Sequence, residues 1–197
     1  MRNISEFCET MMEQTQQKII DAAIQVFNDD LSAPLEKVAE KAAVTRRTLH
    51  RYFKDRVQLL ASCERDMQER CRTAMLAALA SSANPKIQLE QMLYAGIDCG
   101  AKYSFFHKQH MREGHQHSTN NEDCAQFDSI DHHFSNLVNK IKSEGDLNIQ
   151  ITTAWVKMLF ASVIAATVNG QDYGDVARKD LKSFAWFSFS NGIGLKL

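Results

Sequence analysis

Residues 37–56 read KVAEKAAVTRRTLHRYFKDR and carry seven lysines and arginines against two acidic residues, a net charge of +5. The whole chain of 197 residues carries −1, which leaves −6 for the other 177 residues. A basic segment on an otherwise acidic protein is typical of a surface that binds a polyanion such as nucleic acid. The alternative is a solvated helical face with scattered lysines, and the spacing of the segment argues against it.

The spacing is that of a helix-turn-helix. An apolar stripe that starts after Pro34 and ends at Ala42 predicts a short helix, because proline is well tolerated where a helix begins. A turn of about three residues follows, and Thr45 is a suitable N-cap for a second short helix, Arg46–Tyr52. The second helix of such a motif enters the major groove of DNA, and a basic first turn attracts phosphate.

Small and apolar residues suit the inside of this motif. Ala39 and Ala42 would let the two helices approach closely, and Val44 and Leu49 would fill the angle between them. We therefore expect Leu49 and Phe53 to lie in the core, with the arginines on the exposed side.

Helical periodicity also dominates the rest of the chain. Apolar residues recur at helical spacing over Thr15–Asp29, and Asp55 is a candidate cap for a long helix that reaches Ala80. The stretch SSANP, residues 81–85, is the clearest break. Further helices are expected over Pro85–Cys99, Ala101–Arg112, Cys124–Ser143, Ile149–Asn169 (with Asn148 as its cap) and Val176–Asn191.

Composition excludes several other classes of protein. Two prolines and eight glycines are too few for the turns of a β-sandwich or barrel, so an all-α fold is expected. The apolar stretch Met158–Val168 is too short to span a bilayer, and the acidic N-terminus does not predict a signal peptide. Five cysteines without a CxxC pair favour reduced thiols in the cytoplasm. No catalytic or nucleotide-binding motif occurs, so we expect neither an enzyme nor a cofactor.

Residues 42–60, AAVTRRTLHRYFKDRVQLL, and Ile19–Phe27, IIDAAIQVF, resemble the DNA-binding segment of TetR-family (TetR/AcrR-like) transcriptional regulators. The resemblance covers about residues 15–62 and includes a Leu-x-x-Tyr-Phe ending followed by Arg56 and a leucine pair. It implies an N-terminal three-helix helix-turn-helix domain over 1–62, with the helix-turn-helix itself at about 34–53. A C-terminal helical effector-binding and dimerisation domain would cover 63–197.

Residue by residue, the resemblance implies the DNA contacts. Arg46 and Arg47 are expected to recognise bases, since arginine binds the O6 and N7 atoms of guanine bidentately, although each could instead hold phosphate. The family usually has glycine where Ala43 stands, and because a left-handed residue other than glycine is strained, the turn is expected to differ slightly from the family's. The full set of expected DNA-binding residues is Thr45, Arg46, Arg47, Thr48, His50, Arg51, Tyr52 and Lys54.

The last two expected helices are apolar on more than one face, which predicts a homodimer interface rather than only a core hairpin. Its candidate residues are Trp155, Leu159, Val163, Phe184 and Phe187. The resemblance also implies a pocket for a small-molecule effector. Candidate lining residues, each of which could instead be ordinary core, are Tyr94, Tyr103, Phe106, Met111 and Met158.

These expectations together describe a cytoplasmic, dimeric regulator that binds a double-stranded DNA operator. Repression relieved by a small-molecule effector is the expected mode. The alternative is a metal-responsive regulator or a metal-binding helical protein that uses the histidine-rich region 107–133. The weak candidate ligands there are His107, His110, Asp128 and His132.

Overall fold

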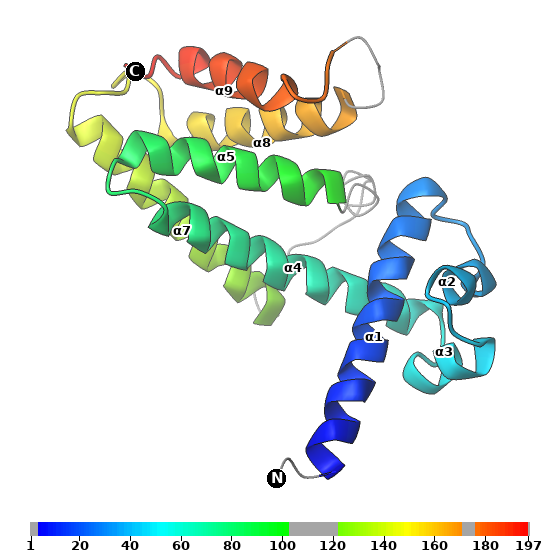
Figure 1. Cartoon of the computed structure of the whole chain (residues 1–197). Helices are drawn as coiled ribbons and strands as arrows, with labels where there is room; N and C mark the ends of the chain where they lie inside the picture. The colour runs from blue at the N-terminus through cyan, green and yellow to red at the C-terminus, as the bar shows by residue number, and fades with distance from the viewer. Residues whose placement is uncertain (1–3, 103–121, 171–175, 197) are drawn as a thin grey trace. The chain divides into compact units, whose positions relative to one another are not determined.

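This computed structural model of the chain describes residues 4–102, 122–170 and 176–196 (Figure 1). Within these ranges the chain forms helices and no strand, which confirms the predicted all-α fold. The helices are α1 (Ile4–Asp29), α2 (Leu35–Lys41), α3 (Arg46–Tyr52), α4 (Arg56–Ala80), α5 (Pro85–Lys102), α7 (Glu122–Ser143), α8 (Thr153–Gly170) and α9 (Leu181–Gly192).

The described residues pack as two compact units that divide within α4, between Met67 and Gln68. The N-terminal unit is built from α1, α2, α3 and the first half of α4. There α1 packs on α2, and α2 packs on α3. The predicted core residues Leu49 and Phe53 are buried, as are Ala39 and Ala42 at the contact between the short helices.

Helix α4 begins where the sequence predicts it, at its expected cap residue. The Asp55 carboxylate accepts a hydrogen bond from the backbone N–H of Gln58 at 2.9 Å, so Asp55 is the predicted cap of α4. The start of α1 is different, because the helix begins at Ile4 and not at Thr15. The Thr15 hydroxyl donates to the carbonyl of Met11 at 2.8 Å, as a threonine inside a helix does.

Helix α2 ends in a Schellman motif. The backbone N–H of Val44 donates to the carbonyl of Ala39, and that of Ala43 donates to Glu40. Ala43 has the left-handed conformation that a glycine would have in this turn, with φ of 50°. Gly145 and Gly194 have the same role after α7 and α9, with φ of 78° and 63°. Ala43 therefore stands where two equivalent turns of this chain have glycine.

Ala43→Gly is expected to stabilise the N-terminal unit. Left-handed backbone costs a residue with a Cβ about 1–2 kcal/mol, and glycine loses about 0.5–1 kcal/mol through the entropy of the unfolded chain. The free energy of unfolding in urea should therefore rise by about 0.5–1 kcal/mol. The neighbouring Ala42→Gly is the control, because Ala42 is buried and has φ of −74°, and it should be destabilising. Equal effects of the two substitutions would contradict this account of strain.

The C-terminal unit is a helical bundle built from the second half of α4 and from α5, α7, α8 and α9. Three phenylalanines join its helices: the rings of Phe134 and Phe160 have centroids 4.8 Å apart, and those of Phe160 and Phe189 are 5.5 Å apart. All three side chains are buried, so the core connects α7, α8 and α9. Figure 1 shows α8 and α9 running side by side, and these two helices pack directly on each other.

Several helix boundaries in this unit differ from the predictions. Helix α5 continues past Cys99 because Gly100 is a packing residue: a Cβ built on it would lie 2.8 Å from Val168 of α8. Helix α8 begins at Thr153 and not at Ile149. The predicted cap, Asn148, instead accepts from the N–H of Gln150, and the hydroxyl of Thr152 accepts from Trp155 at 3.1 Å.

Helix α9 also begins later than predicted. The expected helix starts at Val176, but a turn closed by the N–H of Asp180 and the carbonyl of Ala177 comes first, and the helix starts at Leu181. The predicted helix Ala101–Arg112 lies outside the described residues beyond Lys102.

Candidate nucleic-acid interface

Helix α3 is fixed to its unit by its buried side. Leu49 is fully buried, and Phe53, the C-cap residue of the helix, is 1% exposed. At the other end the Thr45 hydroxyl accepts from the N–H of Thr48 at 3.1 Å and lies 2.9 Å from the Thr48 hydroxyl. Thr45 is therefore the N-cap that the sequence predicts, and the outer side of α3 faces solvent.

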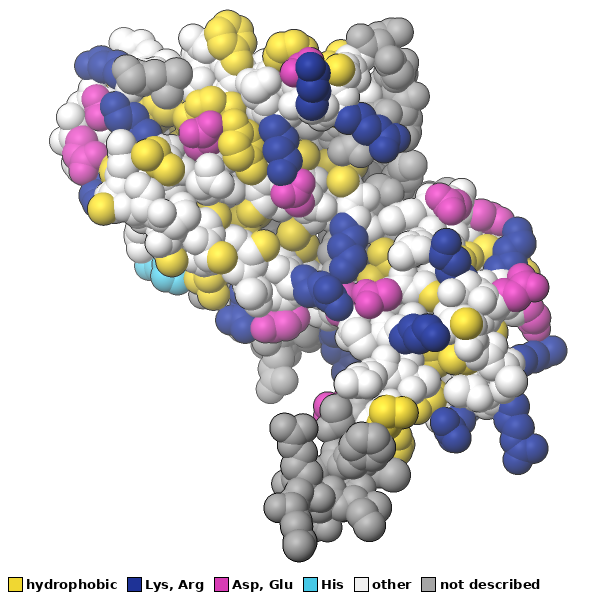
Figure 2. All heavy atoms as spheres, in the orientation of Figure 1, with side chains coloured by type: hydrophobic (Ala, Val, Ile, Leu, Met, Phe, Trp, Pro, Cys, Tyr) yellow, Lys and Arg dark blue, Asp and Glu magenta, His cyan; other side chains and the backbone are white. Residues whose placement is uncertain are grey.

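Basic side chains gather on this unit. Figure 2 shows lysine and arginine side chains around the part of the molecule that contains α2 and α3, with acidic side chains beside them. All but one of the seven basic residues in the quoted segment are exposed: Lys37, Lys41, Arg46, Arg47, Arg51 and Lys54. The positive charge predicted from the sequence is therefore available at the surface.

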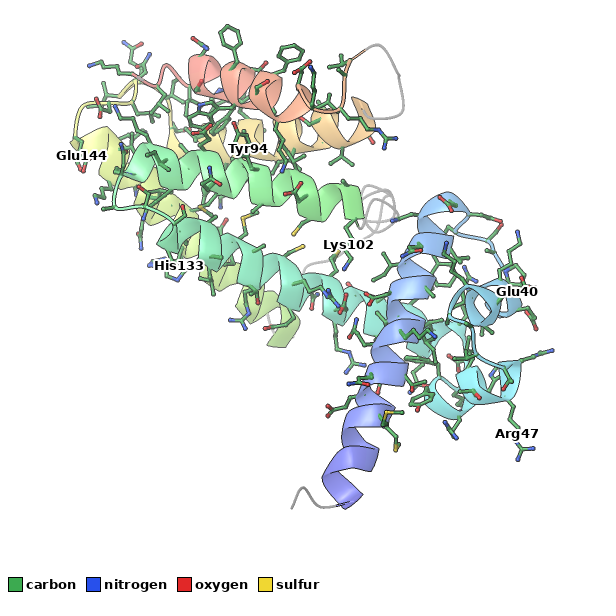
Figure 3. The ribbon with its side chains drawn as sticks, in the orientation of Figure 1. Glu40, Arg47, Tyr94, Lys102, His133 and Glu144 are labelled. Carbon is green, nitrogen blue, oxygen red and sulfur yellow. The ribbon has the colours of Figure 1, made fainter. Side chains whose placement is uncertain are left out.

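The two arginines expected to recognise bases differ in the structure. Arg47 is exposed and extends away from α3 (Figure 3), and it has no hydrogen bond or ion pair with the described part of the chain. Arg46 forms an ion pair with Glu36 of α2, with 3.1 Å between Nη1 and Oε1. Glu36 lies just before the quoted basic segment, and sequence reasoning missed it because nine residues, including the turn, separate it from Arg46.

The remaining predicted contact residues lie on or next to the same helix. His50 is exposed, and Tyr52 is half-buried with its hydroxyl 3.5 Å from the Arg51 guanidinium. The Lys54 side chain is exposed, and its backbone N–H donates to the Gln58 side chain at 2.7 Å. The structure thus places all eight predicted residues on one short helix and its two ends.

Arg56 has a different role from its basic neighbours. Its guanidinium donates to the backbone carbonyls of Leu31 and Ala33, in the loop between α1 and α2. It also lies over the Phe27 ring, with 4.4 Å between the guanidinium carbon and the ring centroid. Arg56 therefore holds the α1–α2 loop against α4 and turns one positive charge of the segment away from the surface.

The residues expected to line an effector pocket are only partly described. Tyr103, Phe106 and Met111 lie outside the described residues. The Tyr94 hydroxyl donates to Glu90 of α5 at 2.7 Å, and partial burial together with this carboxylate raises the pKa of Tyr94 to about 12. Met158 is 61% exposed on the outside of α8, so the structure does not place it between helices with Tyr94.

The residues expected at a dimer interface lie on α8 and α9. Trp155, Phe184 and Phe187 are 52%, 57% and 69% exposed, which is unusual for large apolar side chains. Leu159 and Val163 are half-buried and pack against the core. Both helices therefore present apolar side chains to solvent in the single chain.

The candidate metal ligands are not brought together in the described ranges. His107 and His110 lie outside them, and the side chain of Asp128 is not described. His132 is exposed on α7. No group of three or more His, Cys, Asp or Glu side chains that could hold a metal ion occurs among the residues that the structure describes.

Helix α8 is long and apolar enough to cross a membrane when only length and composition are considered. No other helix in the described ranges meets this test. The observation is weak, because core helices of bundles also pass it, and α8 packs on both α7 and α9.

A family model and a curated relative match the N-terminal unit. The model of bacterial regulatory proteins, tetR family, matches residues 19–63. The HTH-type transcriptional repressor LfrR of Mycolicibacterium smegmatis is 32% identical over 88 residues, which make up 45% of this chain and 47% of LfrR. The match therefore spans about half the length of this relative.

Solved structures match nearly the whole chain. The TetR-like regulator LfrR from Mycobacterium smegmatis in complex with proflavine has a TM-score of 0.69 at 23% identity, covering 93% of this chain and 98% of that one. The fatty acid degradation regulator FadR from Bacillus halodurans has a TM-score of 0.65 at 17% identity, covering 92% and 97%. SCO0520 from Streptomyces coelicolor, a TetR transcriptional regulator, scores 0.59 at 20% identity, covering 92% and 99%. These likenesses establish the fold.

Proposed function

We propose that this chain, whose residues 19–63 match the model of the tetR family of bacterial regulatory proteins, is a sequence-specific DNA-binding transcriptional repressor that acts in the cytoplasm. One observation carries the proposal. Helix α3 buries Leu49 beneath it and presents the exposed Arg47 and the Glu36-paired Arg46 at its first turn. A helix held in this way can enter the major groove, where arginine recognises guanine.

The N-terminal domain is proposed to comprise residues 1–62, and the remaining residues to form the effector-binding and dimerisation domain. We propose a homodimer that covers the exposed apolar side chains of α8 and α9. The buried residues of α8 are Val156, Phe160, Thr167 and Val168, whereas Trp155 and Met158 are exposed in the single chain and leave apolar surface for a partner. Two recognition helices would then bind half-sites separated by about one turn of DNA, roughly 34–36 Å.

A small aromatic molecule is the proposed effector. LfrR has the same fold, and one of its structures is of a complex with proflavine. An effector releases DNA only if it binds the DNA-incompetent state more tightly than the competent one. Proflavine itself is a suitable first probe. Because proflavine also intercalates into duplex DNA, its binding to the protein in the absence of DNA, and not its release of the operator, is the result that would support an effector site.

The test of DNA binding uses a duplex selected from a random-sequence library by the unaltered protein. Fluorescence anisotropy then compares this duplex with a scrambled one over a range of salt concentrations. If a dimer neutralises about eight phosphates, log K should fall against log salt with a slope near −7. Failure to select any sequence, or equal affinity for both duplexes at every salt concentration, would contradict sequence-specific regulation.

Arg47→Ala is expected to weaken operator binding at least 10-fold, because a bidentate arginine–guanine contact contributes about 1–3 kcal/mol and a dimer has two. The control is Arg178→Ala, which removes an exposed arginine from the C-terminal unit and should leave the affinity unchanged. Equal losses in the two variants would mean that only total charge matters.

A further inference from the structure

The ion pair between Glu36 and Arg46 crosses the turn of the helix-turn-helix. Arg46 begins α3 and Glu36 lies in the first turn of α2, with 3.1 Å between Nη1 and Oε1. Both side chains are largely exposed, at 70% for Arg46 and 52% for Glu36. The pair therefore lies on the exposed surface of the helix-turn-helix and is not part of the core.

The pairing is selective within the motif. Arg47, the next residue, has no ion pair with the described residues. Glu40, one helical turn after Glu36 on α2, is exposed and forms no ion pair within the same ranges (Figure 3). One arginine at the start of α3 is thus held by a carboxylate, while the other is free to contact DNA.

The Glu36 carboxylate that pairs with Arg46 is expected to affect non-specific DNA binding and operator binding differently. Non-specific binding comes almost entirely from contacts between basic side chains and phosphates. Glu36 competes with phosphate for the Arg46 guanidinium and also repels the phosphates near it. An exposed ion pair in water is weak, so the competition is modest and reversible.

Binding to the operator does not require the pair to break. A guanidinium has five N–H donors, so Arg46 can donate to Glu36 and to the edge of a guanine at the same time. Glu36 would then orient Arg46 toward the groove. In operator binding, the gain in affinity from this orientation would offset the loss from the repulsion between the Glu36 carboxylate and nearby phosphates.

We propose that Glu36 is a specificity-determining residue: by holding Arg46 across the turn, it weakens binding to non-operator DNA more than binding to the operator. The inference rests on the proposed function. It assigns to an acidic residue, outside the basic segment, the task of limiting non-specific binding.

The test measures the affinity of Glu36→Gln for the selected operator duplex and for the scrambled duplex. With two pairs per dimer, affinity for the scrambled duplex should rise about 3- to 10-fold, and its salt slope should become more negative by about 1–2. Affinity for the operator should change by less than about 2-fold, so the ratio of the two affinities should fall at least about 3-fold. Glu40→Gln is the matched control and should raise both affinities by one common factor.

The same substitutions in the Arg46→Ala protein test whether Glu36 acts through Arg46. In Arg46→Ala, the substitution Glu36→Gln should have no more effect on the affinity ratio than Glu40→Gln, because the pair is already absent. A fall in the ratio that persists without Arg46 would overturn the mechanism. The unaltered protein could bind its operator selectively while Glu36→Gln and Glu40→Gln each change the affinities for the two duplexes by the same factor. In that case this inference alone fails. If the unaltered protein does not discriminate between the duplexes, the proposed function fails and the inference fails with it.

Discussion

Replacing Phe184 and Phe187 together by aspartate is expected to convert the proposed dimer into a monomer. The two side chains are 57% and 69% exposed on α9 in the single chain. Burying a phenylalanine stabilises an association by about 1.5–3 kcal/mol, and a two-fold dimer would bury four of them. Charged side chains at the same positions would in addition require desolvation. The dimer dissociation constant should therefore rise by more than about 1000-fold.

Sedimentation velocity over a range of protein concentrations measures this change directly. The control is Ile149→Asp, which introduces one aspartate, against two in the tested variant, at an apolar residue that is 85% exposed in the loop before α8. The control should stay dimeric, and circular dichroism should show that both variants keep their helices. Operator affinity should fall more than 100-fold in the monomeric variant, since two half-sites can no longer be bound together. A Phe184→Asp/Phe187→Asp protein that remains dimeric would place the interface elsewhere.

Arg56→Ala is expected to destabilise the N-terminal unit by about 3.5 kcal/mol or more. The guanidinium donates to two backbone carbonyls, and hydrogen bonds from charged donors contribute about 1.5–3 kcal/mol each. The contact with the Phe27 ring adds about 0.5–1 kcal/mol. Loss of Arg56 would release the α1–α2 loop from α4, and α2 with it.

The comparison with Arg51→Ala separates stability from DNA binding. Arg51 is exposed and contacts the neighbouring Tyr52, so its removal should change the free energy of unfolding by less than about 0.5 kcal/mol. Urea denaturation of both variants gives the two values. Arg56→Ala should still bind operator at low temperature with an unchanged salt slope, because the Arg56 guanidinium is occupied by the α1–α2 loop and the Phe27 ring. A reduced slope would mean that Arg56 binds DNA after all.

The helix-turn-helix was predictable because its signals are local. Pro34, the alanines of the contact and the Thr45 cap lie within a dozen residues, and each has one dominant conformational effect. Such signals do not depend on the rest of the fold. The family resemblance indicated only that Ala43 replaces a usual glycine, and the structure shows that Ala43 nevertheless has the left-handed conformation.

Features that depend on competition or packing were not predictable. Asn148 and Thr152 are both good cap residues, and the helix begins after the second one because the first forms a tight turn with Gln150. Gly100 could end a helix or pack against a neighbour, and only the position of Val168 on α8 decides between these roles. Met158 could be core or surface, because α8 is apolar on more than one face.

The candidate site also has some features that could be predicted from the sequence and others that could not. Its eight candidate residues follow from one motif, but the pairing of Glu36 with Arg46 depends on the angle between α2 and α3. Nothing in the spacing distinguishes Glu36 from Glu40. Arg56 was grouped with the basic segment by charge, and only the position of the α1–α2 loop shows that it is structural.

The left-handed alanine after α2 also bears on how this protein can change under selection. Any alanine codon becomes a glycine codon by replacement of its second base alone, so the unstrained turn is one nucleotide away from the present gene. A population under selection for heat resistance should reach this change early, because it needs no intermediate of lower fitness. A single nucleotide change can thus remove the strain at Ala43. A change in the packing of the core would instead require several codons to change together.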